Sequence, residues 1–237
     1  MAMTKAGSTA GPGVSLVRPI ETPTAAEQVT KEIRRAILSG ALRPEQKFSL
    51  REIAAQLNVS FIPVREALRA LESEGLVISR PGRSAMVAPL SAEDLHSIYR
   101  LRRQIEPEIA ARSCLMLKDK DFTRLGTFIE VSADPQMTMD DIYDAHHEFH
   151  TDLLRPAATA WDLRTLGVLW HAAERYVRLA FGSLDTQPDE HQRRAEAHST
   201  LITEFRARDP RRASRALLDH LQANEMLARR ALETVID

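Results

Sequence analysis

The chain has 237 residues, of which 43% are hydrophobic and 27% are charged, with a net charge of −1 and a single cysteine. This composition is typical of one large or two smaller globular domains, and one cysteine excludes an internal disulfide and fits a reducing compartment. The sequence contains no apolar run long enough to span a bilayer and no signal-peptide core near its start. It therefore predicts a cytoplasmic protein with no membrane partner.

Charge is distributed unevenly along the chain. Residues 24–89 contain ten Lys and Arg against seven Asp and Glu, a net charge of +3, whereas residues 90–237 contain 20 against 25, a net charge of −5. A mildly basic front segment and an acidic back segment are compatible with nucleic-acid contact through the front segment only.

Helix signals begin after a polar tail. Residues 1–20 are rich in Gly, Ser, Thr and Pro without any hydrophobic period, which predicts a disordered tail. Thr24–Glu27 and Ser49–Glu52 are capping-box patterns, and each precedes apolar residues at helical spacing. Ser60 is a candidate N-cap for a third helix, which should end at Gly75.

A turn signal, Pro81-Gly82, separates two short segments of strand character, residues 76–80 and 84–89. Residues 21–90 are thus predicted to form two helices, a short turn, a third helix and a hairpin. That order is typical of a winged helix-turn-helix DNA-binding domain.

The back segment, residues 91–237, has helical periodicity and no segment of strand character. Asp-Pro, Arg-Pro and Gln-Pro pairs separate its helices. Helices are expected at 92–117, 120–132, 138–155, 159–182, 188–208 and 210–234. The predicted fold is mainly α: an N-terminal winged helix-turn-helix followed by an all-helical antiparallel bundle of about six helices, which we interpret as a ligand-binding domain.

Four stretches of the front segment carry a family resemblance. They are ILSGALRP at 37–44, LREIA at 50–54, VSFIPVREAL at 59–68 and LESEGLV at 71–77. On these stretches the segment closely resembles the GntR superfamily of bacterial transcription factors. The resemblance implies sequence-specific binding to double-stranded operator DNA by a homodimer, whose two winged domains face two half-sites.

DNA contacts are expected from the start of the second helix, the start of the third helix and the tip of the wing. The candidate residues are Arg51, Ser60, Phe61, Ile62, Arg65, Gly82 and Arg83. Arg51 and Arg65 match DNA-contacting positions of the family; without the motif they would be interpreted as solvated helix charges. Phe61-Ile62 stands where the family usually has Arg-Thr, and this apolar pair is expected either to meet a thymine methyl group or to pack against the wing.

Four of the eight histidines fall on apolar faces of three predicted helices. They are His146, His150, His198 and His220. An unpaired polar group on such a face costs about 1–3 kcal/mol, and a shared metal ion would satisfy all four imidazoles at once. Bundles build metal sites in this way, from side chains on facing helices. The alternative is that each histidine is a hydrogen-bonded core residue.

The back segment also resembles a known family, more loosely than the front. The best stretches are LRRQIE at 101–106, FH at 149–150, EAH at 196–198 and DHL at 219–221. They are similar to the FCD-type effector domain of the FadR-like branch. This resemblance implies a ligand-responsive regulator, most commonly a repressor, that is released by a small organic acid bound with a divalent metal. Where many members have Asp, this chain has His146, and an all-imidazole set favours zinc or nickel over manganese or magnesium.

Arg102 matches a position that holds an effector carboxylate in the family, and a guanidinium can bind a carboxylate through two hydrogen bonds. The alternative is an ordinary helical ion pair with Glu106, four residues on. Arg175 and Arg178 are further candidates that no sequence signal places in the pocket. His147 is rotated by about 100° from His146, so we expect it to face solvent or to support a ligand.

Two other functions are compatible with a histidine cluster. A helical metalloenzyme would need an open metal position and a general base. None of the four histidines belongs to an HExxH or Glu-x-x-His pattern, and Glu148 should face away from the cluster. A metal-sensing regulator, in which the ion itself is the signal, is the second alternative. The winged segment favours a regulator over an enzyme.

Overall fold

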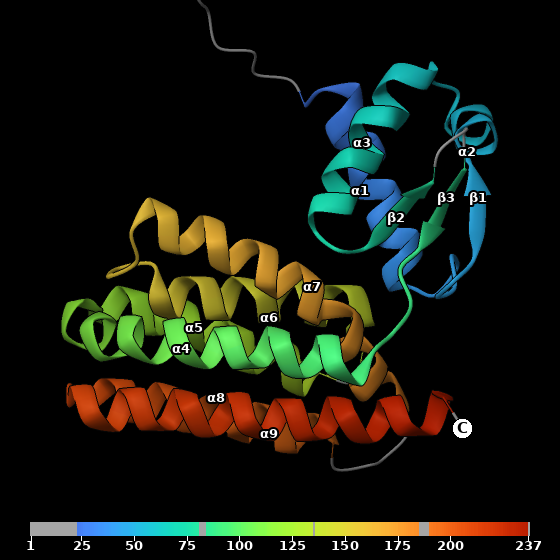
Figure 1. The fold of residues 1–237 in the computed structure, drawn as a ribbon. Coiled ribbons are helices and arrows are strands. Elements are labelled where there is room, and N and C mark those ends of the chain that lie inside the picture. The colour runs from blue at the N-terminus through green and yellow to red at the C-terminus, as the bar shows by residue number, and fades with distance from the viewer. Residues whose placement is uncertain (1–22, 81–83, 135, 185–189, 237) are drawn as a thin grey trace, which may run out of the picture.

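The computed structural model describes residues 23–80, 84–134, 136–184 and 190–236. These residues form a winged helix-turn-helix domain and, below it in Figure 1, a layered helical bundle. The expected tail at residues 1–20 and two candidate DNA contacts at the wing tip, Gly82 and Arg83, lie outside the described residues.

The winged domain begins with three helices: α1 (Ala25–Leu38), α2 (Leu50–Leu57) and α3 (Phe61–Ser73). Both predicted capping boxes are confirmed, because Thr24 caps α1 and Ser49 caps α2 through reciprocal bonds with the glutamates three residues later. Ser60 occupies the N-cap position of α3, but its side chain makes no capping hydrogen bond. The predicted start of the helix is therefore confirmed, although the Ser60 hydroxyl does not supply the capping bond.

Three strands complete this domain, where the sequence predicted two. They are β1 (Lys47–Ser49), β2 (Val77–Arg80) and β3 (Ser84–Val87), in the antiparallel order β1-β3-β2. The unexpected strand, β1, is only three residues long, which is too short to show alternation. Its pairing of Phe48 with Ala85 buries both side chains, so the tertiary contact defines this strand.

The second domain is the predicted bundle of about six helices. Its members are α4 (Ala92–Met116), α5 (Asp119–Ala133), α6 (Met139–Leu154), α7 (Ala160–Leu184), α8 (Glu190–Arg206) and α9 (Pro210–Ile236). The two long helices α4 and α9 lie side by side and run antiparallel (Figure 1). His96 and Arg103, near the start of α4, both contact Glu225 in the second half of α9.

Each domain has its own hydrophobic core, and a short linker joins them. The guanidinium of Arg175 on α7 donates to the backbone carbonyls of Ala88 and Pro89 in that linker. The hydroxyl of Tyr176 accepts from the Ser91 amide at 3.1 Å. These bonds, together with contacts between α1 and α7, hold the winged domain against one face of the bundle. Among the described residues, no helix is both long and apolar enough to cross a membrane.

Candidate metal centre and DNA-binding surface

Three helices of the bundle bring the four histidines together. His146 and His150 are on α6, His198 is on α8 and His220 is on α9, and one ring nitrogen of each lies within 4.8 Å of those of the others. The Nε2 atoms of His146 and His150 are 3.2 Å apart. Two nitrogens bound to one tetrahedral zinc, with Zn–N bonds of about 2.0–2.1 Å, are separated by roughly 3.3 Å. This pair already has the spacing of two ligands of one ion.

Two of these rings present nitrogens with no protein partner. In His198, Nδ1 donates to the backbone oxygen of Arg194 at 2.7 Å, so in the neutral ring the lone pair is on Nε2, which is buried and makes no hydrogen bond. In His150, Nε2 lies against His146 and Nδ1 is buried without a partner, so one of the two nitrogens could bind the shared ion. Such atoms cost free energy unless a ligand satisfies them. The donor set therefore fits a divalent transition metal.

The electrostatics of the cluster keep its imidazoles neutral. Burial lowers the pKa of His198 to about 4. The pKa values of the other three are lowered well below the usual value, first by burial and then by the neighbouring histidines and Arg102. Phe128 and Phe149 pack against the rings, with the Phe128 centroid 4.6 Å from that of His198. Neutral imidazole is the form that binds a metal, so the site is prepared for one.

A small pocket lies against the cluster on the side of α4 and α7. It measures about 30 Å³, and its lining includes His146, His150 and Arg102. Arg102 is only 3% exposed, and its Nε donates to Glu106 at 2.6 Å. Glu106 also accepts from the indole N–H of Trp170 at 2.9 Å. Glu106 thus holds Arg102 in place at the pocket, a more constrained arrangement than an exposed helical ion pair.

His147 neither joins the cluster nor faces open solvent. Its ring stacks on His171, with centroids 5.5 Å apart and planes 5° from parallel, and meets the edge of Trp170. It lines the small pocket, and it also lines a cleft of about 470 Å³ between the two domains. Glu174 is a second shared side chain. His171, Trp170 and Glu174 carried no signal in the sequence, because only the packing of α6 against α7 brings them to this place.

The two other candidate arginines lie outside the pocket. Arg175 binds the linker carbonyls. Arg178 lines the interdomain cleft, where it pairs with Asp140 and Glu174. Glu148, a candidate base in the enzyme alternative, is exposed and lines the same cleft.

On the winged domain, the described DNA-contact candidates lie together and are exposed. Arg51 and Arg65 flank Phe61 around a concavity of about 480 Å³ between the N-terminal ends of α2 and α3. Within the described part of the chain, no ion pair is found for either arginine. Phe61 is 50% exposed and Ile62 is 68% exposed. Among the described residues, this surface combines two arginines that form no ion pair with exposed apolar side chains.

Comparison with known protein families gives two matches. Residues 25–87 match the family described as bacterial regulatory proteins, gntR family, and residues 97–223 match the FCD domain. The second match alone covers more than half of the chain.

Individual relatives are similar over most of their length. One is a probable D-xylose utilization operon transcriptional repressor of Paenarthrobacter nicotinovorans, 31% identical over 84% of this chain and 87% of that protein. Another is the HTH-type transcriptional repressor RspR of Escherichia coli K12, 28% identical over 83% of this chain and 85% of that protein. Among solved structures, E. coli McbR/YncC superimposes with a TM-score of 0.76 at 21% identity, covering 88% of this chain and 99% of that one. That likeness supports the fold.

Proposed function

Because the chain belongs to the gntR family of bacterial regulatory proteins and carries an FCD domain, we propose that this DNA-binding transcription regulator responds to a small organic acid bound with a divalent metal in its bundle. The observation that carries the proposal is the buried four-histidine cluster, which opens on a pocket that contains Arg102. Membership of this family makes the chain a regulator and not an enzyme.

The metal would be held by His146, His150, His198 and His220. Four neutral imidazoles suit zinc or nickel. The ion would supply a positive charge, and it could accept an oxygen ligand by expanding its coordination beyond the four imidazoles. The protein's own part is to orient the rings, as the carbonyl of Arg194 orients His198, and to exclude water from them with Phe128 and Phe149.

Arg102 would bind the carboxylate of the effector. The guanidinium is buried beside the cluster, where it donates to Glu106, and Glu106 in turn accepts from Trp170. A buried, oriented arginine loses little conformational freedom when it pairs with a carboxylate, and its bonds to an anion are charge-assisted. A small carboxylic acid could therefore contact Arg102 with one oxygen and the metal with another, so the two sites would select the same ligand.

The size of the pocket provides a route from binding to regulation. A volume of about 30 Å³ holds little more than one water molecule, so an organic acid must displace part of the wall. His147 and Glu174 are part of that wall and also line the interdomain cleft, whose other side is α1 of the winged domain with Lys31 and Arg34. Displacing these two side chains would change the orientation of the winged domain relative to the bundle. A ligand that binds one orientation more tightly shifts the conformational population toward that orientation.

Repression is the mode we propose, since two of the similar proteins are named as repressors. The functional unit is proposed to be a homodimer, because paired winged domains can face two half-sites of a near-palindromic operator. Binding of the acid would then change the spacing or orientation of the two winged domains and release the operator.

Native mass spectrometry combined with elemental analysis of the purified protein tests the proposal. The expected result is a dimer with one zinc or nickel per chain. Operator binding is then measured by fluorescence anisotropy while a panel of small carboxylic acids is added to metal-loaded protein. Release by an acid from the wild type but not from Arg102→Ala supports the proposal. Metal-free protein that releases the operator equally well with the same acid contradicts it. Release by the metal alone, without any acid, would identify a metal sensor.

A further inference from the structure

The N-terminal end of α3 carries an apolar pair in an unusual setting. Phe61 and Ile62 are 50% and 68% exposed, although the opposite face of the same helix is buried in the domain core. Exposed neighbours of this kind usually mark an interaction surface when charged groups surround them. Here the surroundings are Arg51 and Arg65, for which the described chain provides no ion-pair partner.

We infer that Phe61 and Ile62 read the 5-methyl groups of pyrimidines in the major groove, so that thymine at the contacted positions of the operator is selected by apolar contact. The inference depends on DNA binding by the winged domain. It does not depend on the metal or the acid proposed above.

Helix geometry places the pair where bases are read. Phe61 and Ile62 precede Arg65 by four and three residues, so the three side chains lie within about 100° of one another around α3, and all three are exposed. The first turn of α3 contains no acidic residue, so nothing there repels a phosphate from the positive end of the helix. An arginine that contacts phosphate or guanine would therefore bring the apolar pair against the edges of neighbouring bases.

The chemistry of the groove identifies the partner. Thymine is the base that presents a methyl group in the major groove of unmodified DNA, and apolar side chains recognise it there by contact. Phe61 and Ile62 offer no side-chain hydrogen-bond donor or acceptor, so they cannot satisfy the polar edge of guanine or the amino group of cytosine. Placing them against those groups would desolvate polar atoms without replacing their hydrogen bonds. Placing them against a methyl group buries apolar area on both partners.

The experiment begins with full-length protein and a library of random duplex DNA. Sites selected by binding are resynthesised with deoxyuridine in place of thymine, one position at a time. Uracil forms the same base pair but lacks the 5-methyl group. At each contacted position we expect the wild-type affinity to fall by about fourfold, the factor that corresponds to one buried apolar carbon. Replacing that thymine by cytosine should weaken binding, and 5-methylcytosine should recover part of the loss.

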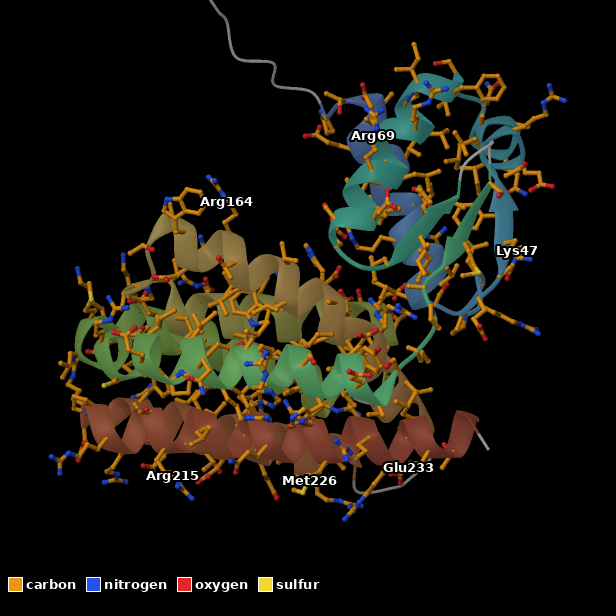
Figure 2. All side chains as sticks on the ribbon, in the orientation of Figure 1. Lys47, Arg69, Arg164, Arg215, Met226 and Glu233 are labelled. Carbon is orange, nitrogen blue, oxygen red and sulfur yellow. The ribbon has the colours of Figure 1, made fainter. Side chains whose placement is uncertain are left out.

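The double variant Phe61→Ala, Ile62→Ala identifies the side chains responsible. Both residues are exposed, so the domain core is unaffected, and the variant should bind thymine and deoxyuridine sites equally. The matched control is Met226→Ala. Met226 is an exposed apolar residue of α9 on the side of the bundle far from the winged domain (Figure 2). This variant should distinguish thymine from deoxyuridine sites as the wild type does. Equal wild-type binding of thymine and deoxyuridine sites overturns the inference. So does a deoxyuridine penalty that the double variant retains, because the methyl group would then act through DNA shape.

Discussion

Removing two of the four proposed metal ligands from the histidine cluster should abolish stabilisation of the protein by metal. In the metal-free protein, the buried Nε2 of His198 has no hydrogen-bond partner, which costs about 1–3 kcal/mol, and a bound ion would remove that cost. At a free metal concentration of a hundred times Kd, binding adds about 2.7 kcal/mol to the free energy of unfolding. For a chain of this length, each kcal/mol raises Tm by roughly 2–4 °C. The wild type should therefore gain about 5–11 °C, and the variant His150→Ala, His198→Ala should gain almost nothing.

Thermal unfolding followed by circular dichroism measures this effect, first with a chelator and then with buffered zinc or nickel. Because each protein is compared with its own metal-free form, the loss of packing in the variant does not enter the difference. His147→Ala is the matched control, since this histidine adjoins His146 in sequence but lies outside the cluster, and it should keep the full metal-induced increase. An equal increase in Tm and an equal metal content for the wild type and the double variant would refute the assignment of the ligands.

Three further predictions use other parts of the molecule. Arg65→Ala should weaken operator binding by about 1–3 kcal/mol if Arg65 contacts a base. Arg164 lies on the bundle away from the winged domain (Figure 2), so Arg164→Ala should leave operator binding unchanged. An equal loss of affinity in both variants would point to a general charge effect. Glu106→Gln should destabilise the protein by several kcal/mol, since it leaves the buried Arg102 without its charged partner, and an unchanged Tm would contradict that role. Metal-free protein should lose stability as pH falls from 6.5 toward 4. Below pH 6.5 the histidines of the cluster bind protons in the unfolded chain but stay neutral in the folded protein. For His198 alone, this difference lowers the free energy of unfolding by about 3 kcal/mol by pH 4. A free energy of unfolding that does not change over this pH range would contradict the burial argument.

Local sequence patterns were sufficient to predict most elements. Capping boxes fix the starts of α1 and α2 because a Ser or Thr hydroxyl and a Glu three residues later satisfy each other's backbone amides. Helical periodicity identified the bundle, since each helix must bury one apolar face. The same periodicity placed the histidines on inward faces, where His198 is 2% exposed. The short strand β1 escaped prediction because its three residues become a strand only by pairing with β3.

What the sequence by itself determined is therefore the order of the elements, the inward direction of the four histidines and the family resemblance, all of which depend on neighbours within a few residues along the chain. The tertiary structure decided which groups from distant helices meet. It brought Trp170 to Glu106 and so fixed Arg102, and it made His147 line both the small pocket beside the histidine cluster and the interdomain cleft. It also left Phe61 exposed beside Arg65. Such contacts arise from the packing of whole helices, which no local pattern of residues encodes.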